Sequence, residues 1–181
     1  MGQGYRNNIN NIIADQTAIT LATTMKALWP VALTMNLANY WKPRMWQKIT
    51  AWGKATTDVT AGNYVFEGAY GAGDAPAALA AGPTVAGSVS QTNITWTAYM
   101  YIECRTSGPT GTFRIWGEWR PSVALLASTL QPYLFPASAP ADITIDTTAA
   151  SLAGTMQAQR SGTGVWTMTT TGLIIEEGQG A

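Results

Sequence analysis

The fold is decided by the stretch Asn93-Ile94-Thr95-Trp96-Thr97-Ala98-Tyr99-Met100-Tyr101-Ile102-Glu103-Cys104-Arg105. Every second residue from Ile94 to Cys104 is apolar, and the residues between them are Thr, Tyr and Glu. Successive side chains of a β-strand point to opposite faces of the sheet. The stretch therefore predicts a strand with one face in the core and one face outward.

A second alternating segment, residues 112–119, follows after a connection rich in Gly and Pro at 106–111. Such a connection is typical of a tight turn between antiparallel strands, so we expect a hairpin. Cross-strand aromatic pairs stabilise a hairpin by about 0.2 to 1 kcal/mol each. We expect such contacts among Tyr99, Tyr101, Trp116 and Trp119.

Weaker alternation predicts further strands at residues 22–29, 48–55, 63–70, 143–146, 151–159, 165–171 and 173–176. Short strands broken by Gly, Pro and Asn are typical of a β-sandwich or barrel. The segments are too closely spaced for helical crossovers, which favours antiparallel pairing. The sequence thus predicts an all-β antiparallel sandwich of about eight or nine strands, with long loops at 71–87 and 121–140.

The chain of 181 residues suits a single domain, for which we expect residues 18–181. The preceding residues, 1–17, are rich in Asn and have few apolar anchors, so they predict an extended N-terminal arm that docks on a partner or stays mobile. The start of the chain has no long apolar segment, so we expect neither a signal peptide nor a membrane span.

Charge is unusually scarce in this sequence. Only 11% of the residues are charged, against about 25% in an average protein, and the formal net charge is zero. We therefore expect no electrostatic attraction to nucleic acid or to a membrane. A surface of so few charges favours a protein whose working state is an assembly. A soluble monomer with a Thr-rich surface remains the alternative.

The side chains that most enzymes use are largely missing. There is no histidine, and the single cysteine, Cys104, lies at an inward position and predicts a buried thiol. Paired carboxylates could still hydrolyse a glycoside, and Glu103 with Glu118 is the pair to consider. Nearby arginines favour surface ion pairs instead, and Asp142 with Asp146 offers too few ligands for calcium. We predict no catalytic residue, no metal and no cofactor.

The most unusual segment is residues 40–48, Tyr-Trp-Lys-Pro-Arg-Met-Trp-Gln-Lys, followed by Trp52 and Lys54. Interleaved basic and aromatic side chains can stack on sugars or bases, and they are also typical of protein interfaces. A third interpretation is that Trp41, Trp46 and Trp52 fill one end of the core while the charged groups reach water. The sequence leaves all three interpretations open.

Five segments recur in this order in one group of proteins: Ala27-Leu28-Trp29-Pro30; Asn39-Tyr40-Trp41; Lys48-Ile49-Thr50-Ala51-Trp52-Gly53; Arg105-Thr106-Ser107-Gly108 with Gly111-Thr112; and Ile143-Thr144-Ile145-Asp146-Thr147-Thr148. By the order of these segments, which span residues 22–177, the chain resembles the small jelly-roll structural proteins of tailed bacteriophages. The resemblance implies a jelly-roll fold and a virion component that is not an enzyme. Such components are often trimeric and sit on the head as decoration or spike proteins, less often at the tail.

The predicted function is therefore that of a virion structural protein, a capsid decoration protein that self-associates, as a trimer, and binds the major capsid protein. We expect it on the outer surface of the phage head after synthesis in the host bacterial cytoplasm. The alternative is a carbohydrate-binding or receptor-binding module that uses Trp41, Trp46 or Trp116 as a stacking platform. The candidate contact residues are Tyr5, Arg6, Ile9, Ile12 and Ile13 in the arm, followed by Trp41, Arg44 and Trp46.

Overall fold

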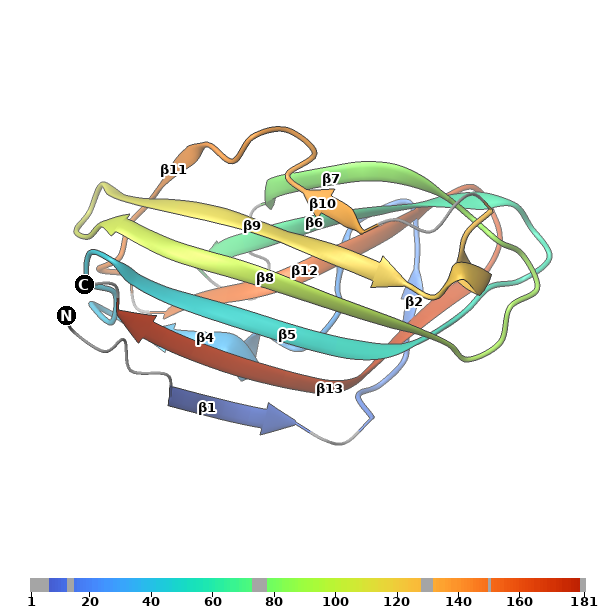
Figure 1. Ribbon diagram of the computed structural model, residues 1–181, viewed down its shortest axis with the longest axis horizontal. Coiled ribbons are helices and arrows are strands. Elements are labelled where there is room, and N and C mark those ends of the chain that lie inside the picture. Colours follow the sequence, from blue (N-terminus) through green and yellow to red (C-terminus); the bar gives the residue numbers. More distant parts are fainter. Residues whose placement is uncertain (1–6, 13–14, 73–77, 128–131, 150, 180–181) are drawn as a thin grey trace.

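The computed structural model describes residues 7–12, 15–72, 78–127, 132–149 and 151–179. It shows two antiparallel sheets packed face to face (Figure 1), which confirms the predicted all-β sandwich. The eight-stranded sheet contains β1 (Asn7–Ile12), β2 (Ile19–Leu21), β5 (Met45–Thr56), β8 (Ile94–Thr106), β9 (Gly111–Pro121), β10 (Tyr133–Phe135), β11 (Asp142–Ile145) and β13 (Trp166–Gln179). The five-stranded sheet contains β3 (Lys26–Ala27), β4 (Met35–Leu37), β6 (Gly62–Ala72), β7 (Ala78–Gly87) and β12 (Ser151–Ser161).

The order of the strands is that of a jelly roll. In the larger sheet β1 and β2 lie beside β13, then β5, then β8, and in the smaller sheet β3 and β4 lie beside β12, then β6, then β7. The antiparallel pairs are nested in the sequence. The last strands pair with the first ones, β13 with β1 and β2 and β12 with β3 and β4, and the strands between them pair as β5 with β8 and β6 with β7. This wrapping of two sheets is the jelly-roll arrangement. Strands β9 to β11 extend the larger sheet beyond β8.

The predicted hairpin is present as β8 and β9. Its inner face carries the side chains expected from the alternation, and Met100, Ile102 and Cys104 are fully buried. Tyr101 and Trp116 lie opposite each other on the outer face and stack, with ring centroids 5.3 Å apart. The prediction for Trp119 is wrong, because this residue lies opposite Ala98 on the inner face. There its ring stacks on Phe66 from the other sheet.

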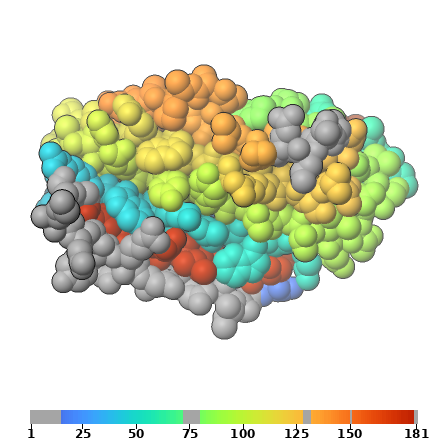
Figure 2. All heavy atoms as spheres, in the orientation of Figure 1, coloured from blue at the N-terminus to red at the C-terminus, as the bar shows by residue number. Residues whose placement is uncertain are grey.

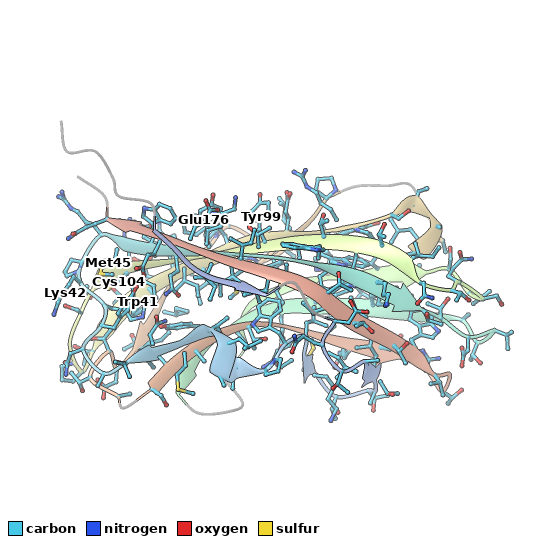
Figure 3. The ribbon with its side chains drawn as sticks, turned by 90° about the horizontal axis from the view of Figure 1, so that it is seen from below. Trp41, Lys42, Met45, Tyr99, Cys104 and Glu176 are labelled. Carbon is cyan, nitrogen blue, oxygen red and sulfur yellow. The ribbon has the colours of Figure 1, made fainter. Side chains whose placement is uncertain are left out.

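Aromatic side chains fill the core at both ends of the sandwich. Trp96, Trp119, Trp166, Tyr64 and Phe66 gather at one end, and Trp41, Tyr70 and Phe113 gather at the other. Cys104 also lies in the core, and burial raises the pKa of its thiol to about 11. The predicted buried thiol is therefore confirmed. Figure 3 shows Trp41 and Cys104 between the two sheets, and Tyr99 and Glu176 on the outer side of the larger sheet.

Strand β7 corrects the loop predicted at 71–87. Its sequence, Ala78–Gly87, is rich in Ala and Gly and includes Pro83, which cannot donate a ladder hydrogen bond. The structure accommodates Pro83 in a bulge, where Gly82 and Pro83 lie opposite Phe66. The second predicted loop, 121–140, is also shortened, because β10 forms inside it. Segments of poor strand propensity thus become strands where a paired neighbour supplies the hydrogen bonds.

Two strand predictions near the chain ends are also corrected. The strand expected at 22–29 is wrong, since only Lys26–Ala27 is extended there and the preceding strand is Ile19–Leu21. The segments predicted at 165–171 and 173–176 form one strand, β13, with a register shift between Thr170 and Gly172. A break in the alternation therefore marked a bulge in one strand and not the gap between two strands.

The predicted arm contributes a strand to its own sheet. Residues 7–12 form β1, which pairs with the end of β13 from Leu173 to Glu177. Three of the candidate contact residues, Tyr5, Arg6 and Ile13, lie outside the described residues. The other two, Ile9 and Ile12, lie in β1, the outermost strand of the larger sheet.

Candidate binding surface on the eight-stranded sheet

The outer face of the larger sheet brings together side chains from three strands. Alternate residues of β5, β8 and β9 point outward, and the register aligns them in rows across the sheet. Figure 2 shows this face, with the side chains of β5 (cyan), β8 (lime) and β9 (yellow) lying beside one another. Two adjacent rows are Trp46, Glu103 and Arg114, followed by Lys48, Tyr101 and Trp116.

Three aromatic residues of these rows form a continuous shelf. The rings of Tyr101 and Trp116 are nearly parallel, at 10°, and Trp46 lies against Tyr101 with a centroid distance of 6.3 Å. The Lys48 ammonium group lies 5.6 Å from the Tyr101 ring centroid, within cation–π range. We call Trp46, Tyr101 and Trp116 the aromatic shelf. Because the rings pack against one another, their positions are fixed before any ligand binds.

A hollow of about 560 Å³ opens above the aromatic shelf at one end of the sheet. Arginine side chains from two elements complete its wall: Arg44 comes from the turn before β5, and Arg105 from the end of β8. The turn at Arg44 has a positive φ of 70°, and the Arg44 backbone N–H donates to the Cys104 carbonyl at 2.8 Å. This bond fixes the turn beside the shelf. The lining residues are Arg44, Trp46, Tyr101, Glu103, Cys104, Arg105 and Trp116.

The hollow is lined by charged side chains of both signs. Arg105 pairs with Glu103, with 2.8 Å between Nη1 and Oε1. Among the described residues, two arginines and one glutamate line the hollow. On the far side of Trp116 a second hollow of about 390 Å³ is lined by Tyr99 and the segment 134–140. None of the described residues of that second wall is charged.

The three tryptophans in and after the segment 40–48 lie in three different environments. Trp41 is only 1% exposed, and its indole N–H donates to the Tyr70 hydroxyl inside the core. It therefore fills one end of the sandwich and is not available for a surface contact. Trp46 and Arg44 line the hollow, whereas Trp52 lies elsewhere on the face, against Gly172.

Sequence reasoning missed Tyr101, Glu103 and Arg105 as partners of Trp46. Alternation placed Tyr101 and Glu103 on the outer side of their strand, but alternation identifies faces and not neighbouring strands. The pairing of β5 with β8, which sets Trp46 opposite Glu103, is known only from the structure. The aromatic shelf is therefore a product of strand order.

The two glutamates considered as an acid pair do not converge. Glu103 lies opposite Arg114, and Glu118 lies opposite Tyr99, four residues further along the ladder. At about 3.4 Å per residue this separates them by about 14 Å, beyond the spacing of glycosidase carboxylates. Each is engaged in an ion pair, Glu103 with Arg105 and Glu118 with Arg120. The expected surface ion pairs are thus present, although Arg114 pairs with Asp142.

The described residues contain no group of three or more His, Cys, Asp and Glu side chains that could hold a metal ion. Asp142 accepts from the Arg114 guanidinium, and Asp146 accepts from the backbone and hydroxyl of Thr148. The two hydrogen bonds from Thr148, chiefly the one from its hydroxyl, lower the pKa of Asp146. Within the same ranges of the chain, no helix is long and apolar enough to cross a membrane.

Comparisons with known proteins return little. No protein-family model and no curated protein matches the sequence. Among solved structures, the chain is similar to a chain in the structure of infectious bursal disease virus Gx strain, with 13% identity and a TM-score of 0.35. The match covers 99% of this chain and 34% of that one, so this chain spans about a third of its length.

Proposed function

We propose that the protein is a virion structural protein, a capsid decoration protein that self-associates as a trimer and binds the major capsid protein on the outer surface of a phage head. Two lines of reasoning support this proposal. The order of sequence segments resembles that of small phage structural proteins, and the jelly roll is a fold that capsid domains use. Because lectins use the same fold, the assignment needs support from the surface as well.

The edge strand β4 carries the argument for assembly. Among the described residues, β4 pairs with β12 only, so its other edge is open to a further strand. Met35 and Leu37 point outward from this strand and are 43% and 77% exposed, whereas Asn36 between them points inward and hydrogen bonds to Gln47. Monomeric proteins usually protect such an edge with charge. An open apolar edge fits contact with another chain.

A matched set of variants tests self-association. Replacing Met35 and Leu37 together by lysine places two charges on the β4 edge without touching the core. We expect the wild type to have the mass of a trimer in light scattering and the double variant to have the mass of a monomer. The control is Val59→Lys, at a residue 81% exposed in the turn after β5, which should leave the mass unchanged. A double variant that keeps the wild-type mass contradicts this use of the edge.

Attachment to the shell is assigned to the N-terminal arm and to the arm residues Tyr5, Arg6, Ile9, Ile12 and Ile13. Among the described residues β1 pairs with β13 only, so its other edge can meet the shell. Many copies on a symmetric shell act together, so a weak contact in each copy is sufficient.

A second candidate function is carbohydrate or receptor binding. One observation favours it, namely the aromatic shelf with its 560 Å³ hollow, a volume typical of small-molecule sites. Binding of a saccharide to the purified chain, which assembly by itself does not require, tests this function.

A further inference from the structure

We infer that the side chains of Asn36, Gln47 and Tyr70 form a register lock, which holds the apolar residues of β4 outward as a docking edge for a strand of a second copy of the chain. The inference rests on the proposed self-association and specifies how the β4 edge is presented. Asn36 and Gln47 are positioning residues, because both are buried and act on the contact only through β4.

The segment Thr34-Met35-Asn36-Leu37 is packed inside out. Its polar side chains, Thr34 and Asn36, are only 3% and 6% exposed, whereas Met35 and Leu37 point outward. A strand of an antiparallel sheet usually turns its apolar side chains to the core and its polar ones to water. A shift of the pairing by one residue would exchange the two faces of β4 and bury Met35 and Leu37. Apolar burial therefore favours the shifted register, and other contacts have to hold the observed one.

A closed set of hydrogen bonds holds Asn36 in the core. Its amide N–H groups donate to Gln47 Oε1 at 3.3 Å and to the Tyr70 hydroxyl at 3.2 Å, and its Oδ1 accepts from Gln47 Nε2 at 2.8 Å. The Trp41 indole N–H donates to the same hydroxyl. Gln47 comes from β5 and Tyr70 from β6, so β4 is tied to a strand of each sheet.

Thr34 fixes the start of β4 by the same kind of contact. Its hydroxyl group donates to the Gly154 carbonyl at 2.6 Å, and the Trp29 indole N–H donates to that carbonyl at 3.2 Å. Gly154 lies in β12, the strand with which β4 pairs. The two inward residues of the segment thus both have polar partners inside the molecule.

The buried amide pair selects one register, because the other register would leave its members apart. If β4 shifted by one residue, Asn36 would leave the core and the Gln47 amide would lose its partner. A buried polar group without a partner costs more stability than a hydrogen bond contributes. Single buried amides fix register and assembly state in coiled coils for the same reason. The register lock therefore selects the register that exposes Met35 and Leu37.

The charge of the chain favours a second copy as the occupant of this edge. Residues 31–41, which contain β4, include no charged side chain, and the formal net charge of the whole chain is zero. Two copies therefore approach each other without net repulsion. An uncharged edge with two exposed apolar side chains offers such a copy both ladder hydrogen bonds and apolar contact.

A cross-strand disulfide measures the register of β4. Leu37 and Ser151 lie opposite each other on β4 and β12. Leu37→Cys with Ser151→Cys should therefore form an intrachain disulfide on mild oxidation, detected by gel mobility. Cys104 does not compete, because burial raises the pKa of its thiol to about 11. Adding Gln47→Leu should lower the yield about tenfold, and this measurement does not depend on self-association.

Light scattering of chains without the added cysteines measures the contact itself. We expect the wild type to have the mass of a trimer and Gln47→Leu to have the mass of a monomer. The swapped pair, Asn36→Gln with Gln47→Asn, keeps two amides facing each other. It should restore both the disulfide yield and the wild-type mass. Circular dichroism checks that each variant is folded.

A milder pair of variants decides the question if Gln47→Leu does not fold. Tyr70→Phe removes only the hydroxyl group that binds Asn36, and it should lower the disulfide yield and weaken association about tenfold. The matched control is Tyr64→Phe, because the Tyr64 hydroxyl is buried at the other end of the core and has no hydrogen-bond partner among the described residues. Equal results for the two variants overturn the inference.

The two measurements separate this inference from the proposed function. A folded Gln47→Leu chain that keeps the disulfide overturns the register lock and leaves self-association in place. A chain that loses the disulfide but keeps the trimer mass overturns the docking edge and moves self-association to another surface. A monomeric wild type overturns self-association itself, and with it the docking edge.

Discussion

At the scale of single residues, the close approach of neighbouring strands and side chains explains why several strands contain glycine. A Cβ atom at Gly117 would overlap the Tyr99 carbonyl oxygen of the neighbouring strand and the ring of Phe135. Phe135 itself is buried and comes from β10, so the ring cannot move outward without opening the core. Gly117 is therefore required for β9 to pack between β8 and β10.

Gly117→Ala is expected to lower the free energy of unfolding by about 3 kcal/mol, because overpacking at a backbone contact cannot be relieved by a rotamer change. Chemical denaturation of the variant measures this loss. The control is Thr110→Ala in the exposed turn of the same hairpin, expected to change stability by less than about 0.5 kcal/mol. Equal stability of the two variants would show that β9 can shift to accept a side chain.

Asp58 links two turns by hydrogen bonds to its carboxylate. The backbone N–H groups of Val165 and Thr60 donate to it and hold its pKa below the ordinary value of 3.8. A lowered pKa in the folded state means that the charged carboxylate stabilises the fold above pH 3.8 and that this contribution is lost as the pH falls below it. Asp58→Asn should thus lower the melting temperature at pH 6, and the difference from wild type should shrink toward pH 3. A difference that grows on acidification has the opposite sign and contradicts the assignment.

The sequence predicted the inward and outward residues of β8 because its alternation has no break. It could not separate Trp41 from Trp46, because Trp41 precedes β5 in an irregular segment where no period applies. Trp41 enters the core through its contacts with Tyr70 and Phe113, which come from two other strands. Burial of such a residue depends on contacts between strands that are distant in the sequence.

At the scale of elements, five of the predicted strands correspond to β5, β6, β8, β9 and β12, and β11 was placed nearly to the residue. The elements that were missed or misplaced lack a clean alternation. Strand β7 is Ala-rich with a bulge at Gly82 and Pro83, and β3 is a two-residue strand on the edge of its sheet. Such elements become strands because they pair with a neighbouring strand, and a single sequence does not reveal which strand that is.

Deleting residues 1–17 is expected to leave a folded, self-associating protein with weaker attachment to the shell. Strand β2 keeps its pairing with β13 at Trp166 to Met168, so removal of β1 frees only the far end of β13. A loss of about 1.4 kcal/mol in each shell contact corresponds to a tenfold lower affinity. Co-sedimentation with empty shells measures attachment, and circular dichroism measures folding. An unfolded truncated chain would show that β1 is required for the sandwich.

At the scale of the whole molecule, the jelly roll explains how a chain with only 11% charged residues builds its core. Nested pairs such as β5 with β8 and β6 with β7 bring two apolar faces together and leave polar residues outside. The sandwich class followed from alternation and turn spacing. The strand order did not, since alternation does not name neighbours. The aromatic shelf and the β4 edge depend on that order and so became visible only in the structure.

We propose that this jelly roll is a self-associating subunit attached to a phage shell. The most direct test is the mass of the purified chain by light scattering, with and without the cognate empty shell. The proposal predicts a trimer in solution that co-sediments with the shell. A monomer that does not bind the shell would contradict the decoration function and leave saccharide binding at the aromatic shelf as the function to pursue.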